Sequence, residues 1–436
     1  MTQAPTRTAT DRADVVAGVA AVGLFVLAAG VGAALGLMQR PVRALAAPLF
    51  GHVWPHVGPG TPLALVTAGL VVWHGPQLAA RMRWGRLLGV AYATALAWTF
   101  SLALVDGWQR GLSSRLTTRH EYLSDVHRVT VRDFTDRILD RQPDSWATHV
   151  AGHPPGALLV FAALDRIGLG GGDWAAVTCV LVGASTAISV PVAVRALAGV
   201  TAARAVIAFV VLFPGAVWVG ASADGLFTGV TAAGIALLAT AARRDGPAAT
   251  ALAAGAGGVL GFACFLSYGM VLMAPIAVAV LVAARRLAPV PPALFGAAAV
   301  TAAFAGAGFW WPDGYHLVVE RYHQGIANDR PYAYWVWANL ACLVAAAGPA
   351  VAPILRRAVR DVRALPWLVL PLSAAVAVLL ADLSGLSKAE VERIWLPFAI
   401  WLLAGASVLP TSHRRGWLAV QAATALAVNH LLLTAW

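Results

Sequence analysis

The sequence predicts an all-α protein that crosses a membrane many times. The first observation is composition: 59% of the 436 residues are hydrophobic, only 12% are charged, and the mean hydropathy is +0.73. A single soluble core cannot enclose so much apolar surface. The second is that apolar stretches of roughly 18 or more residues, the length that a helix needs to cross a bilayer, recur along the whole chain.

We expect about 13 transmembrane helices in one domain. The first apolar stretch is too long for a cleaved signal peptide, so we expect it to remain as the first span. We find no Gly/Ser-rich linker and no internal repeat, so 1–436 is treated as a single transmembrane domain. The expected spans are 15–38, 61–80, 87–105, 173–194, 205–220, 224–242, 248–267, 269–284, 290–309, 335–354, 365–382, 393–410 and 417–434.

Arginine clusters give these spans an orientation. If the N-terminus is cytoplasmic, five clusters fall on the cytoplasmic side, as the positive-inside rule requires. That side then holds 17 of the 31 Lys and Arg residues and 4 of the 20 Asp and Glu residues, and the other side holds 14 and 16. The net charges of +13 and −2 together make the +11 of the chain. The clusters are 81–86, 243–244, 285–286, 356–363 and 414–415.

This distribution predicts a multi-pass membrane protein with a cytoplasmic N-terminus. The longest outer segment is then the loop 106–172. The basic residues lie at the ends of spans and form no stripe that could follow a phosphate backbone, so we expect no nucleic-acid partner.

Three carboxylates of the outer loop are candidates for a general base. Asp106 follows a span directly, in "ALVDGWQRG". Glu121 and Asp125 lie four residues apart in "HEYLSDVH", so they share a face if this stretch is helical. Such a carboxylate can take a proton from a hydroxyl group. The alternative for each is a solvated loop residue.

The stretch "HVAGHPPGALLVF" (149–161) combines two histidines with a rigid turn. Pro154 and Pro155 restrict the backbone before an apolar run that is too short to span, so we expect an interfacial or re-entrant helix after them. Because Pro154 opposes a helix at His149 and His153, and no carboxylate has a suitable spacing, we expect no metal site and no cofactor. The histidines then bind phosphate or sugar, or form a structural pair.

The stretch "VRDFTDRILDRQ" (131–142) places Phe134, Ile138 and Leu139 on one helical stripe. This pattern predicts a short amphipathic helix, either on the membrane surface or solvated within the loop.

Further candidates lie on the other outer segments. Arg393 opens the span "RIWLPFAIWLL", where it could stabilise charge on a phosphate or extend to the interface as a snorkelling side chain. Asp224, at the start of its span, is interpreted as a helix cap, with a side chain that faces the cavity as the alternative. The candidates for binding substrate are His149, His153, Arg321, His323, Arg330, Glu392 and Arg393.

Three of these stretches resemble the GT-C superfamily of membrane glycosyltransferases, and in particular actinobacterial integral-membrane members. They are "HPPG" with the following "LDRIGLGGGDWAAV", "GIANDRPYAYWVWANL" (325–340) and "AEVERIWLPFAIWLL" (389–403). The resemblance covers about two thirds of the chain, over 100–400. In this chain the long loop follows the third expected span, so two helices are added at the N-terminus.

The resemblance implies a function and a site. It implies a bacterial plasma-membrane enzyme of the inverting type that transfers a hexosyl or pentosyl group from a polyprenyl-phosphate donor, within membrane lipid, to a glycan or glycolipid of the cell envelope. It also implies a catalytic carboxylate in the first large outer loop, which falls on Asp106, with Glu121 and Asp125 as alternatives. The other hypotheses are a transporter or flippase of lipid-linked saccharides and a non-catalytic subunit of an envelope-synthesis complex. Convergence of the three carboxylates would favour the enzyme, and separation would favour the subunit.

Overall fold

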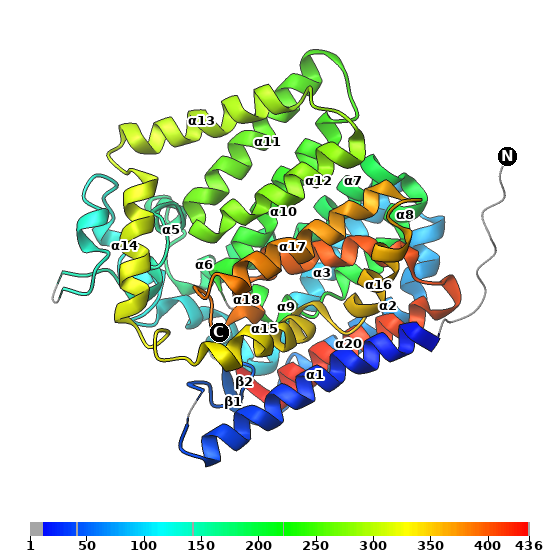
Figure 1. The fold of residues 1–436 in the computed structure, drawn as a ribbon, viewed down its shortest axis with the longest axis horizontal. Coiled ribbons are helices and arrows are strands. Elements are labelled where there is room, and N and C mark those ends of the chain that lie inside the picture. The colour runs from blue at the N-terminus through cyan, green and yellow to red at the C-terminus, as the bar shows by residue number, and fades with distance from the viewer. Residues whose placement is uncertain (1–11, 41, 142–143, 221, 435–436) are drawn as a thin grey trace.

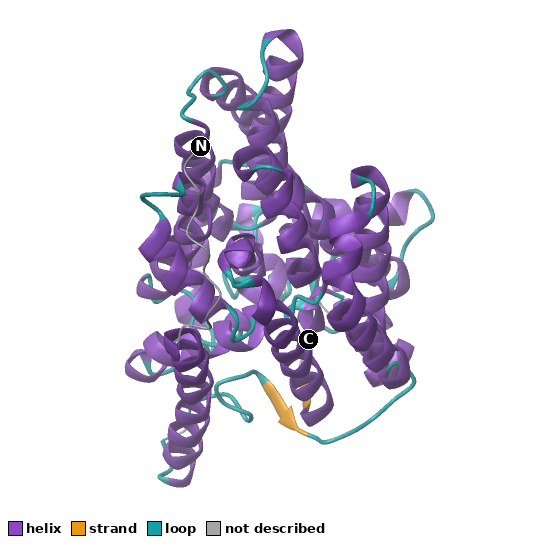
Figure 2. Ribbon diagram, turned by 90° about the vertical axis from the view of Figure 1, so that its right-hand side faces the viewer, coloured by secondary structure: helices purple, strands orange, loops and turns teal. Residues whose placement is uncertain are grey.

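Helices make up nearly the whole protein (Figures 1 and 2). The computed structural model describes residues 12–40, 42–141, 144–220 and 222–434. Within these ranges the strands form one two-stranded sheet. The prediction of an all-α membrane fold is therefore confirmed.

Three groups of elements follow one another along the chain. The first group comprises α1 (Arg12–Leu37), β1 (Gly51–Val53), α2 (Thr61–Arg81) and α3 (Trp84–Ala103). The second group follows α3 in the segment that we call the outer loop, after the side predicted for it. It contains short 3-10 or π turns and two helices: η1 (Leu104–Asp106), η2 (Gln109–Ser113), η3 (Arg115–Thr117), η4 (Tyr122–Ser124), η5 (Val126–Arg128), η6 (Thr135–Arg137), α4 (Thr148–Ala151) and α5 (Gly156–Arg166).

The third group contains the remaining helices. Its first half consists of α6 (Gly172–Ala184), α7 (Thr186–Ala198), α8 (Val200–Val211), α9 (Ala216–Val219), α10 (Ala223–Ala241), α11 (Gly246–Leu266), η7 (Tyr268–Met273), α12 (Ala274–Ala284) and α13 (Val290–Gly306). Its second half consists of α14 (Trp311–Gln324), α15 (Tyr332–Ala347), α16 (Val351–Asp361), η8 (Pro366–Leu368), α17 (Val369–Leu383), α18 (Val391–Ile394), α19 (Leu396–Leu402), η9 (Leu403–Val408), η10 (Thr411–His413), α20 (Arg414–Leu431) and β2 (Leu432–Thr434).

Seven helices of the described residues are long and apolar enough to cross a membrane. Two bent pairs, α13 with α14 and α15 with α16, raise the number to nine if each pair is one span. This is fewer than the total of about 13 that hydropathy predicts. Several expected spans are shorter helices or are interrupted, because α8 stops before Pro214 and α15 is followed by Gly348 and Pro349.

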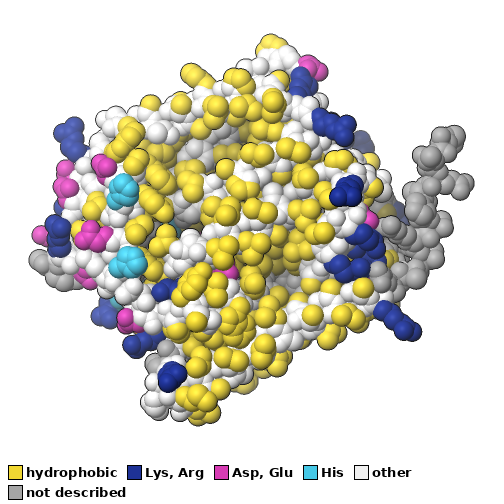
Figure 3. Space-filling model, viewed as in Figure 1, with side chains coloured by type: hydrophobic (Ala, Val, Ile, Leu, Met, Phe, Trp, Pro, Cys, Tyr) yellow, Lys and Arg dark blue, Asp and Glu magenta, His cyan; other side chains and the backbone are white. Residues whose placement is uncertain are grey.

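Charged side chains gather at the two ends of an apolar band (Figure 3). Lys and Arg dominate the end near the start of α1, and Arg, His, Asp and Glu mix at the opposite end, where the outer loop and α14 lie (Figures 1 and 3). We call the first the arginine-rich end and define it by the clusters 81–86, 243–244, 285–286, 356–363 and 414–415.

The short sheet joins the two terminal regions of the described chain. β1 pairs antiparallel with β2, so that Gly51 lies opposite Thr434 and Val53 opposite Leu432. A Cβ atom on Gly51 would lie 2.6 Å from the Leu433 carbonyl oxygen, so only glycine fits this close approach. The loop after α1 is thereby held against the end of α20.

The expected helix over 131–142 is wrong. Its described residues form one 3-10 turn, η6, and the predicted stripe of Phe134, Ile138 and Leu139 is buried inside the protein. Phe134 stacks on Trp146 with ring centroids 5.1 Å apart and meets Phe309 edge-on at 5.8 Å. These aromatic contacts within the outer region satisfy the apolar side chains, so the stretch is not an amphipathic helix on the membrane surface.

A buried ion-pair cluster fastens α1 to α16 at the arginine-rich end. Asp14 is 0% exposed, and its two carboxylate oxygens accept hydrogen bonds from Arg356 Nη2 at 2.7 Å and Arg357 Nε at 2.7 Å. A buried carboxylate is tolerated only with such partners.

We expect Asp14→Ala to destabilise the protein by about 3–5 kcal/mol, because it leaves the buried Arg357 without its carboxylate. Thermal unfolding of the purified protein measures the loss. Asp361→Asn is the matched control, since Asp361 pairs with the more exposed Arg360 at the same end and should change stability by about 1 kcal/mol or less. Equal effects of the two substitutions would contradict this account.

Candidate active site

A strained turn before α18 places Arg393 at the outer-loop end. Ala389 and Glu390 both have left-handed backbone conformations, with φ of 66° and 62°. Residues other than glycine adopt this conformation rarely, and such strain is concentrated at functional sites. Asn339 of α15 stabilises the turn, because its Nδ2 donates to the Ser387 carbonyl at 2.9 Å and its Oδ1 accepts from the Ala389 amide at 3.2 Å.

Arg393 bridges two carboxylates from distant parts of the chain. Its Nη1 donates to Asp224 Oδ2 at 2.7 Å and its Nη2 donates to Glu390 Oε2 at 2.8 Å. Arg393 is only 5% exposed, so the expectation that it snorkels to an interface is wrong. Burial opposes its charge, but the two carboxylates outweigh burial and raise the pKa of Arg393 above its ordinary value.

Arg330 extends this ion-pair arrangement. Its Nη2 donates to Glu390 Oε1 at 2.7 Å and its Nη1 donates to the Lys388 carbonyl at 2.6 Å. Burial raises the pKa of Glu390, but Arg393 and Arg330 outweigh it and hold that pKa below its ordinary value. Glu390 is therefore a carboxylate shared by two guanidinium groups.

Glu121 lies in the electrostatic field of the same groups. It is 4% exposed, and burial raises its pKa to about 7. Arg393 opposes this rise, whereas the charges of Asp224 and Glu390 add to it. Such a carboxyl group exchanges a proton near neutral pH, which suits a general base or acid. We call Glu121, Asp224, Arg330, Glu390 and Arg393 together the Arg393 cluster.

His149 adjoins Glu121, and His153 contacts His149 just before the Pro-Pro turn. His149 Nε2 lies 3.4 Å from Glu121 Oε1, and His153 Nδ1 lies 2.7 Å from the His149 carbonyl oxygen. Burial lowers the pKa of both histidines, so each imidazole is neutral near pH 7. In the described part of the chain, no group of three or more His, Cys, Asp and Glu side chains could hold a metal ion.

The turn itself has the geometry that its sequence predicts. Pro155, with φ −65°, is the N-cap residue of α5, a short helix of 11 residues. A Cβ atom on Gly156 would lie 2.4 Å from the Phe265 carbonyl oxygen, so this glycine lets α5 pack closely on α11. The His153 ring packs between those of Tyr122 and Phe227, with centroids 5.7 Å from each. The prolines and these rings hold the histidines in place.

Asp125 is used by the loop itself. Its Oδ2 accepts a hydrogen bond from the Ala147 amide at 2.7 Å, and its Oδ1 accepts one from Arg128 at 3.0 Å. Both oxygens have protein partners, so the contacts of Asp125 connect the two halves of the outer loop.

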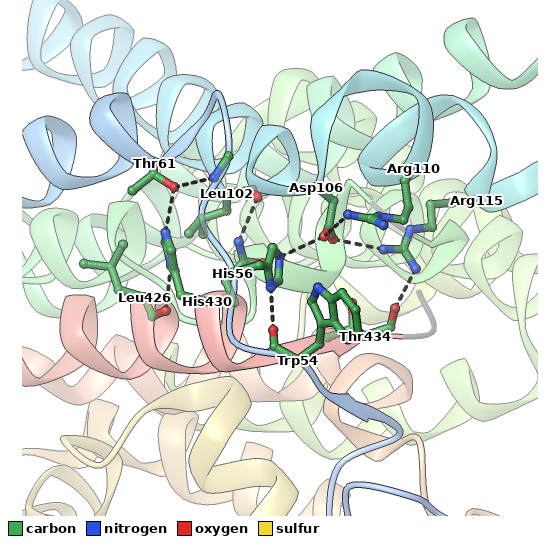
Figure 4. A network of polar contacts seen from close by, with 12 residues as sticks. Trp54, His56, Thr61, Leu102, Asp106, Arg110, Arg115, Leu426, His430 and Thr434 are labelled. Carbon is green, nitrogen blue, oxygen red and sulfur yellow. Dashed lines mark hydrogen bonds and ion pairs between the residues drawn. The ribbon is translucent and has the colours of Figure 1, made fainter.

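Asp106 belongs to a different network (Figure 4). Its Oδ1 lies 3.0 Å from His56 Nε2, and its Oδ2 accepts from Arg115 Nη2 at 3.1 Å. Arg115 Nη1 donates in turn to the Thr434 carbonyl at 2.7 Å, and His56 Nδ1 lies 2.6 Å from the Trp54 carbonyl. The network joins the end of α3 to the loop before α2 and to β2.

The three candidate bases therefore occupy separate settings, so the convergence expected of the enzyme is not found, and by this criterion alone the arrangement favours the non-catalytic subunit. A different set of carboxyl groups, those of Glu121, Asp224 and Glu390, lies around Arg393.

The other predicted binding residues divide into two groups. Arg330 and Arg393 meet at Glu390. Glu392 faces another segment: its Oε1 accepts from the Phe50 amide at 2.9 Å. Arg321 pairs with Asp140 at 2.8 Å, and His323 Nδ1 lies 3.1 Å from Asn328 Oδ1. Among the described residues, the hydrogen bond of His323 and the ion pair of Arg321 are made outside the Arg393 cluster.

Two residues of the cluster are absent from the predicted set. Ser222, and not Asp224, is the N-cap residue of α10, and the Asp224 carboxylate instead pairs with Arg393. Glu390 lies three residues before Arg393 and pairs with it. An acidic residue in the first turn of an otherwise apolar helix was the available signal for Asp224.

Comparisons with known proteins show a partial likeness of fold. No family model matches the chain, and no curated protein matches it in sequence. Two crystal structures of ArnT from Cupriavidus metallidurans are similar, one in the apo state with 15% identity and a TM-score of 0.47, and one bound to undecaprenyl phosphate with 16% identity and a TM-score of 0.46. Each similarity covers 73% of this chain and 60% of the ArnT chain.

Proposed function

We propose that the protein is a membrane glycosyltransferase that moves a sugar from a polyprenyl-phosphate donor to a glycan or glycolipid of the cell envelope, on the outer face of a bacterial plasma membrane. The observation that carries the proposal is Glu121, a buried carboxyl group with a pKa of about 7 that lies beside His149 and in the field of Arg393. The GT-C resemblance of the surrounding sequence supplies the substrate class.

Glu121 acts as the general base in this proposal. It takes the proton of an acceptor hydroxyl group while that oxygen forms a bond to the anomeric carbon of the sugar. The bond from the anomeric carbon to the phosphate oxygen breaks, and its electron pair leaves with the polyprenyl phosphate. A single displacement of this kind inverts the configuration at the anomeric carbon. The geometry favours Glu121 over Asp106 and Asp125, because those two carboxylates have structural partners on both oxygens.

The residues around Glu121 have separate roles in this proposal. Arg393 lowers the cost of ionising Glu121 and stabilises the charge that develops on the departing phosphate. Neutral His153 donates its one N–H, at Nδ1, to the His149 carbonyl oxygen, so its Nε2 can accept a hydrogen bond from a sugar hydroxyl group, whereas His149 lies with its Nε2 against Glu121. Asp224 and Glu390 are positioning residues, since they hold the Arg393 guanidinium from two sides.

The decisive experiment is an activity assay with defined donors. Purified protein is incubated with a panel of radiolabelled polyprenyl-phosphate sugars and an envelope extract, and the products are separated by lipid extraction and chromatography. We expect label to move from one donor to a new product. If the protein in lipid vesicles instead moves an intact labelled lipid from one leaflet of the bilayer to the other, without a new covalent product, the transporter is supported. Neither transfer nor movement across the full panel would support the non-catalytic subunit.

The orientation is open to a direct test. In a variant without Cys179, Cys264 and Cys342, a single cysteine replaces His120 or Arg244. We expect a membrane-impermeant maleimide to label position 120 from outside intact cells and to label position 244 only after permeabilisation, because the arginine-rich end faces the cytoplasm. Outside labelling at 244, or none at 120, would reverse the orientation and remove the outer-face assignment.

A further inference from the structure

A cavity at the arginine-rich end shares no lining residue with the Arg393 cluster. The last turns of α2 and the first turns of α8 and α20 border it, with a volume of about 370 Å³. Among the described residues that line the cavity none is acidic, and two are arginines, Arg204 and Arg414. Its electrostatic character therefore favours an anion.

Both arginines are anchored before any ligand arrives. Arg204 Nη1 donates to the Ala79 carbonyl in the last turn of α2. Arg414 Nε and Nη2 donate to the carbonyls of Leu409 at 3.1 Å and Ser407 at 2.8 Å. A guanidinium group has five N–H donors, so these bonds leave further donors at the cavity. Side chains that are already ordered lose little entropy when they bind.

The rest of the cavity is apolar and lies at the end of membrane-spanning helices. Ala208, Phe209 and Leu418 form buried parts of its wall. Trp73, which is 66% exposed on α2, lies near it, with the Arg415 guanidinium 5.9 Å from its ring. Exposed tryptophans with neighbouring arginines are typical of the membrane–water interface. A small free anion would use the arginines alone, whereas a lipid uses both the arginines and the apolar wall.

We propose that this cavity binds the phosphate headgroup of an acidic glycerophospholipid. The phosphate accepts hydrogen bonds from Arg204 and Arg414, and the glycerol and upper acyl chain lie along the apolar wall. Basic pockets between transmembrane helices bind acidic lipid headgroups in this way. The site shares no residue with the Arg393 cluster, so it is independent of the proposed glycosyltransferase activity.

Native mass spectrometry of the purified protein tests this proposal, with dioleoyl-phosphatidylglycerol and dioleoyl-phosphatidylcholine as probes. We expect wild-type protein to prefer phosphatidylglycerol and Arg204→Gln/Arg414→Gln to bind it about tenfold or more weakly, because charge-assisted hydrogen bonds are lost. Arg243→Gln is the matched control: Arg243 also donates to a helix carbonyl, that of Ala196, but does not line the cavity. It should keep the preference.

Three outcomes would overturn the proposal. They are equal binding of the two lipids by the wild type, an equal loss in Arg243→Gln, and full competition by inorganic phosphate, which would indicate a site for the free anion. If the double variant does not fold, Ala80→Trp decides the question. This substitution fills the cavity from an exposed position on α2 and keeps both arginines, so it should displace the lipid. Undiminished binding in Ala80→Trp would place the lipid elsewhere.

Discussion

Glu121→Gln should lower kcat/KM by about 10²–10⁴-fold, because the amide keeps the shape of the side chain but cannot take the proton from the hydroxyl group of the acceptor. Binding of the polyprenyl-phosphate donor should survive, because the base acts on the acceptor and contributes only in the transition state. The measurement is initial-rate kinetics with the donor identified by the panel assay, together with a separate donor-binding titration.

The raised pKa of Glu121 predicts how both activity and stability depend on pH. Activity of the wild type should rise as pH rises through about 7, where the buried carboxyl group ionises. We call this rising part of the pH–activity profile the pH limb, and Glu121→Gln should lose it. Stability should change in the opposite sense. In the unfolded chain the carboxyl group ionises near its ordinary pKa, so its contribution to wild-type stability falls as pH rises from there to about 7. Above pH 7, Glu121→Gln should therefore be at least as stable as the wild type in thermal unfolding.

The two other candidate carboxylates serve as comparisons for Glu121→Gln. Asp125→Asn removes a buried carboxylate of the same loop that pairs with Arg128, so it should lower stability and keep the pH limb of activity. Asp106→Asn tests the assignment that the resemblance implies. If Asp106→Asn loses the pH limb and Glu121→Gln keeps wild-type turnover, the base is Asp106. Full activity in all three variants would refute a carboxylate base.

Arg393→Ala should produce the largest loss of stability in the outer region, about 3–5 kcal/mol, together with a loss of activity of about tenfold or more. The substitution leaves Asp224 and Glu390 in a buried environment without their shared guanidinium group. It also removes the positive charge that opposes the raised pKa of Glu121, so the pH limb of any residual activity should move to higher pH. Thermal unfolding and the pH dependence of kcat/KM measure the two effects.

Two comparisons separate the chemical role of Arg393 from its structural role. Arg393→Lys keeps the charge but not the two-pronged geometry, so it should restore the pH limb and still bind donor more weakly than the wild type. Asp224→Asn removes one partner and keeps the arginine, so it should lower stability without abolishing donor use. Wild-type kinetics in Arg393→Lys would contradict a bidentate role toward phosphate.

Composition and local sequence pattern were sufficient to predict the class of fold and several local features. Apolar stretches of spanning length predict membrane helices whatever their partners, because a lipid-exposed backbone must satisfy its own hydrogen bonds. Likewise, Pro154 and Pro155 restrict their own backbone, so the turn and the short helix α5 after it follow from nearest neighbours. The stripe of Phe134, Ile138 and Leu139 predicted an amphipathic helix, whereas these side chains are buried within the protein beside a 3-10 turn.

The tertiary structure alone decided which charged residues act together. Asp224 and Arg393 are 169 positions apart, and the sequence contains no signal that joins them. Glu121 and Asp125 are neighbours with similar chemistry, yet only Asp125 has an arginine and a backbone amide on its oxygens, whereas Glu121 is buried beside His149. The proton affinity of a carboxyl group depends on its burial and on charges within a few ångströms, and the folded chain sets both through segments that are remote in sequence.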